Sequence, residues 1–237
     1  MIDLTGLKLV REYIELDMVD STNRYALDAD RKGLLVTARE QTAGRGRQGR
    51  IWFSPPGENI YMTLTVQAPD PRLCLVAGVA VHAALAGLVE GVEVKIKWPN
   101  DILIGGRKVC GILCEARGDI AAIGIGVNVN QTAWPVELKN VASSLKLATG
   151  RTLALDDILQ TIIHSLDHWL TLYRNQGFEP VRTAFLEHGP YRGSPATLED
   201  GTPCVILGLS PEGFLEVEVS GRRRTIVSGD VMPASAG

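Results

Sequence analysis

The sequence has little net charge, few cysteines and no long uninterrupted hydrophobic run. Its 24 Lys and Arg against 27 Asp and Glu leave a formal net charge of −3, which gives no bulk electrostatic reason to expect a nucleic-acid or membrane partner. The N-terminal segment MIDLTGLKLVREYIEL carries charges throughout and lacks the apolar core of a signal peptide. The longest apolar run, residues 73–89, is interrupted by His82 and two glycines and is shorter than a membrane span. We therefore expect neither a targeting segment nor a transmembrane helix.

The four cysteines have no C-x-x-C spacing, which argues against a sequence-local metal or redox motif. Cys110 and Cys114 share one face of a strand-like run, so we interpret them as buried thiols. A hydrophobic content of 45% excludes a disordered chain, and 237 residues can bury a core without a disulfide or a structural metal. These features predict a reduced, cytoplasmic globular protein.

Hydrophobic periodicity predicts strands and helices that alternate over the first 190 residues. Strand-like segments lie at residues 10–16, 34–39, 59–66, 92–98 and 120–129, and helix-like segments at residues 22–30, 73–88, 156–173 and 179–186. Gly105 and Gly106 can take the positive φ angles that a two-residue hairpin turn requires. Strands joined largely by hairpins, with helices between them, indicate an α+β fold with a mixed or antiparallel sheet.

The chain changes character near residue 190. Residues 194–233 consist of short β-prone runs separated by Gly, Pro and Asp, a pattern that is typical of a small β-barrel. A unit of about 45 residues has little core of its own. We therefore predict a main α+β domain over residues 1–190 and a small β-domain over residues 191–237.

The most informative motif is the segment GRGRQGR, from Gly44 to Arg50. It matches the G-x-G-x-x-G pattern of dinucleotide-binding folds, which requires a helix to open at the last glycine. Here Pro55, Pro56 and Gly57 follow instead, and they forbid that helix. The segment is therefore a glycine-rich loop with three arginines between two strands. Such a loop suits an anion, since glycines let backbone N–H groups approach closely and arginines supply planar charge. The alternatives are a solvated basic turn and a weak RNA-binding stretch.

A second motif, KWPND, ends a strand and is followed by Arg107-Lys108 at the start of the next one. It places Asn100 and Asp101 at a loop edge, where they could position a metal–phosphate group, and Lys108 could reach the same space. The alternative is a turn in which Asn and Asp bond their own backbone. Asn128 lies at the end of an apolar strand, where an amide is costly unless it is hydrogen-bonded.

Two further patterns have simple structural interpretations. The triplet Ser21-Thr22-Asn23 has the composition of a helix N-cap. His164 and His168 have the i,i+4 spacing of a zinc helix, but both fall opposite the apolar stripe of residues 156–173, so we expect them to face water without a metal.

Taken together, these motifs resemble those of the biotin protein ligases. The order S-T-N, Q-x-A-G-R-G-R-x-G-R-x-W, K-W-P-N-D, R-K-x-x-G-I-L and G-x-N-x-N is that family's signature, and it covers about residues 10–130. The resemblance implies a class II synthetase-like catalytic domain with an SH3-like C-terminal barrel. It also implies an enzyme that joins biotin to ATP as biotinyl-5′-AMP, with Mg²⁺, and then transfers biotin to a lysine of a biotin carboxyl carrier protein.

The resemblance also implies roles for individual residues. The residues that would contact biotin are Ser21, Thr22, Asn23, Gln41, Gly44, Arg45, Gly111, Ile112 and Leu113, the last three along its valeryl chain. The residues that would contact ATP or the adenylate are Arg47, Arg50, Trp52, Asn100, Asp101, Lys108 and Asn128. Lys108 and Arg47 would stabilise the reacting anions, and Asp101 would assist the acceptor amine. No side-chain metal site is implied beyond Mg²⁺ that arrives with ATP.

The sequence differs from the bifunctional members of the family at its N-terminus, and one related enzyme family is an alternative. Bifunctional members carry an N-terminal winged helix-turn-helix, whereas the first strand here is expected near Val10, so the chain resembles the monofunctional form and we expect no nucleic-acid partner. Members often pair through the catalytic sheet, which would give a homodimer. The nearest rival is a lipoate or octanoate ligase or transferase of the same fold. We expect the loop of residues 44–50 to be mobile when empty, because its glycines make it entropically costly to fix and its arginines would lack an anion.

Overall fold

A seven-stranded sheet forms the centre of the computed structural model, which describes residues 2–89, 91–189 and 192–233. Its strands are β1 (Glu12–Val19), β2 (Leu34–Gln41), β3 (Ile60–Gln67), β4 (Val94–Lys97), β5 (Asp101–Ile104), β6 (Arg107–Arg117) and β7 (Ile120–Val127). The order across the sheet is β1-β2-β3-β7-β6-β5-β4. Strand β1 runs parallel to β2, and the other neighbouring pairs are antiparallel. The predicted mixed sheet is confirmed.

Hairpins connect the strands that carry the second motif. Gly105 and Gly106 join β5 to β6 with φ angles of 55° and 73°, as the hairpin prediction required. A second hairpin joins β6 to β7 through Gly118, whose φ is 58°. These two tight turns align the first residues of β5 and β6 with the last residues of β7, so the second motif and Asn128 lie at one end of the sheet.

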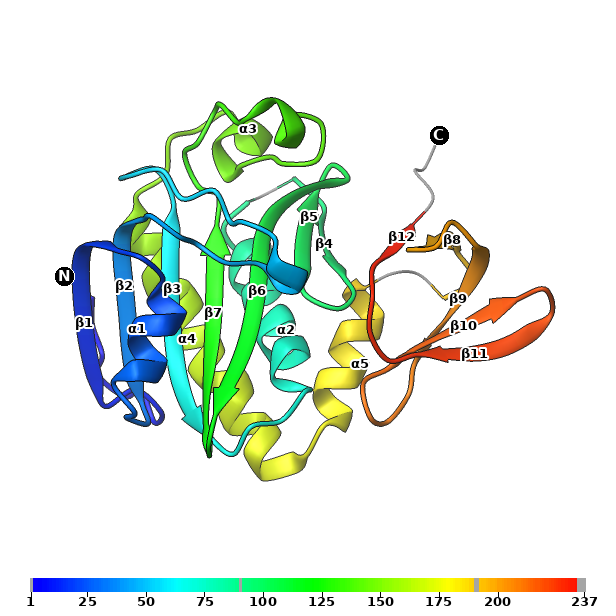
Figure 1. Cartoon of the computed structure of the whole chain (residues 1–237), viewed down its shortest axis with the longest axis horizontal. Helices are drawn as coiled ribbons and strands as arrows, with labels where there is room; N and C mark the ends of the chain where they lie inside the picture. The colour runs from blue at the N-terminus through cyan, green and yellow to red at the C-terminus, as the bar shows by residue number, and fades with distance from the viewer. Residues whose placement is uncertain (1, 90, 190–191, 234–237) are drawn as a thin grey trace.

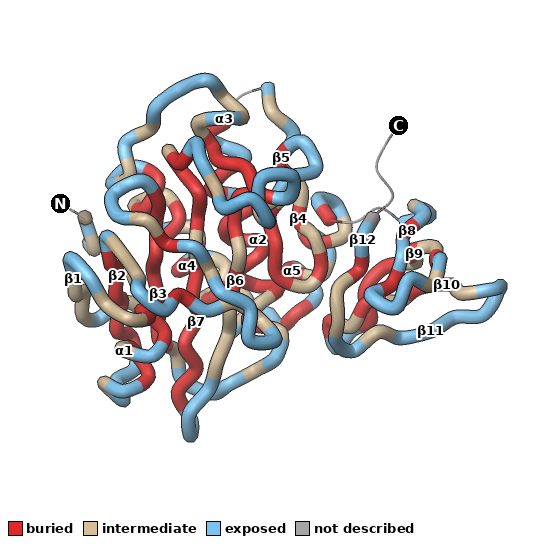
Figure 2. Tube along the Cα trace, turned by 45° about the horizontal axis from the view of Figure 1, so that its top comes forward, coloured by how far each residue is buried: buried red, intermediate tan, exposed pale blue. Residues whose placement is uncertain are grey.

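One face of the sheet is covered by three helices, α2 (Leu73–Ala86), α4 (Leu155–Gln176) and α5 (Glu179–His188) (Figure 1). Helix α2 is buried almost all round because it lies between the sheet and α4, as its unbroken apolar composition predicted. Helix α4 instead buries a single stripe, which includes Ile158, Ile162, Leu166 and Leu170. The resulting core is the continuous buried layer in Figure 2. The packing of these helices on this face of the sheet therefore stabilises the fold.

The opposite face carries the short helix α1 (Thr22–Asp28), the glycine-arginine loop and a single 3-10 turn, η1 (Arg47–Gly49). Ala26 of α1 packs against Leu34 and Val36 of β2. Ser21 is the N-cap residue, as predicted, although its side chain makes no capping hydrogen bond. Two small elements, η2 (Val136–Leu138) and α3 (Leu145–Thr149), cover the end of the sheet near β6 and β7.

A second, five-stranded antiparallel sheet forms the C-terminal part, as the predicted small β-domain requires. Its strands are β8 (Pro195–Leu198), β9 (Pro203–Leu209), β10 (Leu215–Val219), β11 (Arg222–Ile226) and β12 (Val231–Pro233), in the order β11-β10-β9-β8-β12. The predicted boundary between residues 190 and 191 lies outside the described residues. Within the described part of the chain, no helix is both long enough and apolar enough to cross a membrane.

Candidate active site

The floor of the candidate site is a patch of glycines on the sheet face opposite α2. A Cβ atom on Gly111 would lie 2.8 Å from Cζ3 of Trp52, and one on Gly126 would lie 2.5 Å from its Cε2. A Cβ atom on Gly124 would lie 2.1 Å from Oδ1 of Asn23. These three glycines leave bare backbone on β6 and β7, so the indole and the amide rest directly on the sheet. No larger residue fits there without displacing them.

A chain of hydrogen bonds connects the predicted biotin-binding residues above this floor. Thr22 gives its backbone N–H and its hydroxyl to Oε1 of Gln41, at 2.9 and 3.1 Å. The hydroxyl of Thr63 lies 2.9 Å from Oγ1 of Thr22 and 2.7 Å from Oδ1 of Asn23. Gln41 in turn donates from Nε2 to Oγ of Ser54 at 3.0 Å. The structure thus brings together hydroxyl and amide groups from α1, β2 and β3 in one buried set.

Gly44 begins the glycine-arginine loop at the edge of this set. A Cβ atom there would lie 2.5 Å from the Trp52 carbonyl oxygen and 2.6 Å from Oγ of Ser54, so glycine is required. The loop then forms the single 3-10 turn η1, in which Gln48 has a φ of 55°. Extended backbone follows it, and no helix opens at Gly49. The rejection of a dinucleotide-binding fold is confirmed.

Each arginine of the loop has a carboxylate near it. Arg45 donates to Glu115 at 2.8 Å, and Arg50 donates to Asp230 at 2.7 Å. Nη1 of Arg47 lies 3.7 Å from the Asp230 carboxylate. The expectation that these arginines lack an anion is therefore wrong, because acidic residues outside the motifs supply one. One of the two reasons for a mobile empty loop therefore fails, and the mobility itself stays a prediction that rests on the glycines.

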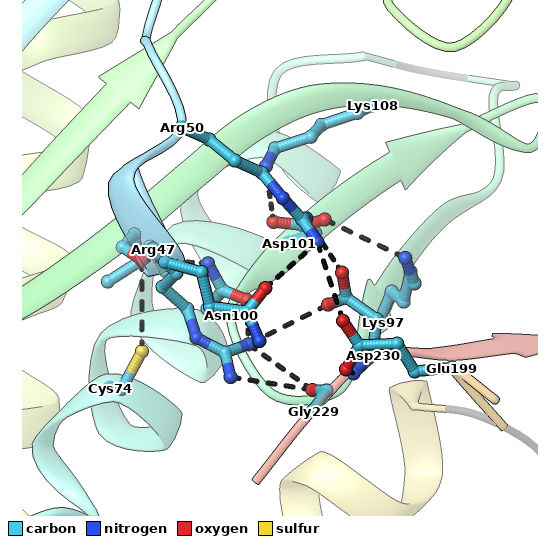
Figure 3. A network of polar contacts seen from close by, with 12 residues as sticks. Arg47, Arg50, Cys74, Lys97, Asn100, Asp101, Lys108, Glu199, Gly229 and Asp230 are labelled. Carbon is cyan, nitrogen blue, oxygen red and sulfur yellow. Dashed lines mark hydrogen bonds and ion pairs between the residues drawn. The ribbon is translucent and has the colours of Figure 1, made fainter. Parts of the chain in front are cut away.

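The Asp230 contact joins the C-terminal sheet to the loop (Figure 3). Its neighbour Gly229 accepts from Arg47 Nη2 at 3.4 Å, and Glu199 lies 3.9 Å from Arg50 Nη2. Burial acts to raise the pKa of Asp230, but hydrogen bonding to Arg50 and the charges of nearby lysine and arginine side chains outweigh it and hold that pKa below its usual value. The carboxylate is therefore ionised at neutral pH and compensates part of the loop's positive charge.

Lys108 and Asp101 form the centre of the charged part of the site. Lys108 Nζ lies 2.6 Å from Asp101 Oδ1 and 5.3 Å from the centroid of the Trp52 ring. Lys97 approaches the other carboxylate oxygen of Asp101 at 3.9 Å. Asn100 accepts from Arg47 at 3.0 Å, which connects the second motif to the loop (Figure 3). Two sequence motifs that lie about 50 residues apart therefore share one polar cluster, as predicted.

Asn128 is buried and directly follows β7. Its Nδ2 donates to the carbonyl of Ser143 at 2.9 Å, which fixes the orientation of the amide, and its Oδ1 and second N–H are the polar groups that could contact a ligand. The prediction for the side chain of Ile112 is wrong. Its side chain is 1% exposed and faces α2, where its Cδ1 lies near Gly78, so only its backbone can border the site. Successive side chains on a strand alternate between faces, and Gly111 and Leu113 take the site face.

Four functional residues escaped the sequence analysis. Thr63, Ser54, Glu115 and Asp230 all bond to predicted site residues, yet none belongs to a recognisable motif. The alternation of β3 could have indicated Thr63, since a threonine between buried residues needs a hydrogen-bond partner. No local signal could have indicated Asp230, because its contact depends on how the two sheets dock. His164 and His168 are exposed on α4, and the described residues contain no group of three metal-ligating side chains.

Comparisons with known proteins agree with this arrangement. The model of the Biotin/lipoate A/B protein ligase family matches residues 15–130. The bifunctional ligase/repressor BirA of Bacillus spizizenii is 35% identical over 95% of this chain and 76% of its own length. The biotin–[acetyl-CoA-carboxylase] ligase of Paracoccus denitrificans is 33% identical over 91% of this chain and 98% of its own.

Solved structures of biotin protein ligases have the same fold. The biotin protein ligase from Aquifex aeolicus, in complex with biotin and ATP, superposes with a TM-score of 0.86 at 29% identity, over 94% of this chain and 98% of that one. The glycine floor, the amide and hydroxyl set and the arginine-lysine cluster thus lie in a fold that is shared along nearly the whole chain. The chain belongs to the biotin protein ligase family.

Proposed function

We propose that this site activates biotin with ATP to give biotinyl-5′-AMP and then transfers biotin to a lysine of a biotin carboxyl carrier protein. One observation carries this proposal: the amides and hydroxyls of the buried Thr22 and Asn23 and of the partly buried Gln41 lie next to the cations of Arg47 and Lys108 on a single glycine floor. The neutral set suits a ureido ring, which both donates and accepts hydrogen bonds. The charged set suits a carboxylate and a triphosphate.

The first step brings two anions together. A biotin carboxylate oxygen attacks the α-phosphorus of ATP, the bond from that phosphorus to the α,β-bridging oxygen breaks, and pyrophosphate leaves with the bonding electrons. Cations that are already oriented lower this barrier most, since they need not reorganise as charge develops. Lys108 is held by Asp101 at 2.6 Å and Arg47 by Asn100 at 3.0 Å, so both are fixed before a ligand arrives. We assign these two cations to the carboxylate and the α-phosphoryl oxygens.

The remaining residues divide between the two substrates. Gly44, Arg45 and Leu113 border the biotin side with Ser21, Thr22, Asn23 and Gln41. Arg50 binds the β- and γ-phosphates of ATP, and these phosphates must compete with Asp230 for its guanidinium. The amide of Asn128, oriented by its bond to Ser143, suits the edge of adenine, which both donates and accepts hydrogen bonds. Trp52 covers the adenylate.

Mg²⁺ fits this site as a companion of ATP. Mg²⁺ usually keeps several waters and takes one or two carboxylates besides phosphates. Asp101 is the acidic residue of the second motif, and the part of the chain that the structure describes contains no acidic cluster that could hold the ion alone. When bound with ATP, the ion would neutralise charge on the phosphates.

The second step needs a neutral lysine amine. It attacks the carbonyl carbon of the mixed anhydride, a new amide bond forms, and AMP leaves with the bonding electrons. Asp101 lies between Lys108 and Lys97, and it is the residue that we assign to assist removal of the amine proton.

Lipoate and octanoate lack the ureido group, so they would not use the hydrogen-bonding capacity that Thr22, Asn23 and Gln41 have beyond their bonds within the protein. Buried polar groups that lose their partners strongly disfavour the wrong substrate. Exchange of labelled pyrophosphate into ATP tests this directly. We expect exchange that requires biotin and is absent with lipoate or octanoate. Exchange driven by lipoate would assign the chain to the related lipoate ligases, and no exchange with any of these acids would contradict an adenylating enzyme.

Three properties remain predictions. We expect a cytoplasmic enzyme, a homodimer formed through the catalytic sheet, and no nucleic-acid partner. The net charge of −3 supports the last of these, since DNA binding draws its affinity from positive charge. Gel filtration with light scattering would measure the oligomeric state, and a salt-sensitive mobility shift with duplex DNA would contradict the absence of nucleic-acid binding.

A further inference from the structure

Glu115 lies where three separate parts of the site meet. It belongs to β6 and shares the site face with Gly111 and Leu113, because side chains along a strand alternate between faces. Its Oε2 accepts from Nδ2 of Asn23 at 2.9 Å and from Nη2 of Arg45 at 2.8 Å. One carboxylate oxygen thus connects the strand floor, the first residues of α1 and the glycine-arginine loop.

The bond to Glu115 determines which way the Asn23 amide faces. The Nδ2 group of Asn23 is fully used, by Glu115 and by the carbonyl of Leu113 at 3.1 Å. Its Oδ1 lies over Gly124 and accepts from Thr63 at 2.7 Å, with one lone pair left. A flipped amide would place Oδ1 against an ionised carboxylate, which can only accept. Glu115 therefore fixes which end of the Asn23 amide donates, and Oδ1 remains its acceptor end.

The same carboxylate holds Arg45. The Arg45 side chain is 43% exposed and that of Glu115 is 27% exposed, so this ion pair lies at the solvent-facing edge of the site. Asn23, by contrast, is 3% exposed. A hydrogen bond between an ionised carboxylate and a buried amide is stronger than one between neutral groups, and the loss of one partner leaves the other unsatisfied. The inner contact, to Asn23, therefore carries more of the effect than the rim contact.

We propose that Glu115 is a positioning residue for biotin: it fixes Asn23 as a hydrogen-bond acceptor for a ureido N–H and holds Arg45 beside the bound acid. This inference rests on the proposed function. Glu115 touches neither ATP nor the reacting atoms in this arrangement. Its loss should therefore affect the biotin KM far more than the ATP KM or the stability of the fold.

The test is Glu115→Gln, with Glu137→Gln at an exposed glutamate as the matched control. Glutamine keeps the size and can still present one oxygen to Asn23 and Arg45, but it removes the negative charge that strengthens both hydrogen bonds. In biotin-dependent pyrophosphate exchange, we expect the biotin KM to rise about tenfold or more, which is the effect of losing a charge-assisted hydrogen bond. The ATP KM and the melting temperature should stay within error of the control.

A double-mutant cycle with Arg45→Gln adds a readout that a merely structural role would not give. If Glu115 acts partly through Arg45, the two changes should raise the biotin KM by less than the product of their separate effects. An unchanged biotin KM in Glu115→Gln would overturn the inference, and so would a parallel rise in both KM values with a lowered melting temperature. If Glu115→Gln does not fold, Glu115→Asp replaces it. Aspartate keeps the charge on a shorter side chain, farther from Asn23 and Arg45, and it must still raise the biotin KM without raising the ATP KM. Failure of the proposed function is distinguishable, because the wild type would then show no biotin-dependent exchange.

Discussion

At the scale of single residues, the glycines at positions 111 and 126 determine where the Trp52 indole can lie. Both present bare backbone to the ring, and a Cβ at either position would come within 2.8 Å of it. The ring lies in turn beside Lys108, at 5.3 Å from its Nζ. A methyl group on the floor would therefore disturb the indole and the catalytic cation together.

We expect Gly126→Ala to raise the KM for ATP or biotin at least tenfold, because the indole must move away from the sheet and no longer covers the adenylate. Gly78→Ala in α2 is the control. A Cβ there would have only ordinary contacts, the shortest at 3.6 Å to Ile96, and alanine within a helix stabilises it by about 0.5–1 kcal/mol relative to glycine. Equal kinetics for the two variants would contradict a floor that must stay bare.

Residues in contiguous motifs were predictable, and residues that reach the site from elsewhere were not. Lys108, Asp101 and Arg47 could be identified because each belongs to a short motif, and the structure brings all three into one cluster. Glu115 and Asp230 could not, since their roles depend on strand register and on docking of the C-terminal sheet. The side chain of Ile112 was placed on the wrong face of the sheet, because the motif was matched without regard to the alternation of side chains along a strand.

At the scale of elements, the start of α2 is fixed by a clamp that has no catalytic role. Asp70 accepts from Arg72 at 2.7 Å and from the hydroxyl of Tyr173 in α4. The Arg72 guanidinium also lies over the rings of Tyr173 and Phe178, at 5.6 and 5.7 Å. The clamp joins the buried helix α2 to α4 and to the residue before α5. Helical periodicity predicted these helices well, but it contains no information about such contacts between them.

The clamp predicts a pH dependence of stability. Burial acts to raise the pKa of Asp70, but hydrogen bonds from Arg72 and Tyr173 outweigh it and lower that pKa to about 2, below the value of about 3.9 in an unfolded chain. The stabilisation is therefore complete above pH 4 and is lost as the pH falls from about 4 to 2. With a discount for partial exposure, Asp70→Asn should cost about 1–2 kcal/mol of unfolding free energy at pH 7.

Urea unfolding of wild type and Asp70→Asn between pH 7 and pH 2 measures this dependence. The difference in unfolding free energy should shrink toward the acid end, as the Asp70 carboxylate becomes protonated and loses the charge that asparagine also lacks. A difference that stays constant with pH would show that the lost contact does not depend on the charge of Asp70.

At the scale of the whole molecule, the two sheets share one hydrophobic core. Buried residues of the C-terminal sheet, among them Ile206, Leu209 and Val217, belong to the same cluster as those of α2, α4 and α5. Polar contacts also cross between the two parts: Trp98 donates to the carbonyl of Gly213 at 3.2 Å, and Arg182 donates to the carbonyl of Leu209 at 2.8 Å. The change in composition near residue 190 predicted a separate unit, but composition cannot predict how closely that unit docks.

We therefore expect the chain to unfold as a single cooperative unit. Calorimetry should show one transition whose calorimetric and van't Hoff enthalpies agree. Two resolved transitions would mean that the C-terminal sheet folds independently of the shared core.

We propose above that the cations of the loop and the second motif activate biotin. Pyrophosphate exchange should therefore be compared between Lys108→Ala and Lys139→Ala, a control at an exposed lysine. We expect biotin-dependent exchange in wild type and the control, and a loss of about 100-fold in Lys108→Ala, the usual effect of removing one preorganised contact to the developing charge. Exchange at the wild-type rate in Lys108→Ala would mean that Lys108 does not take part in the activation of biotin.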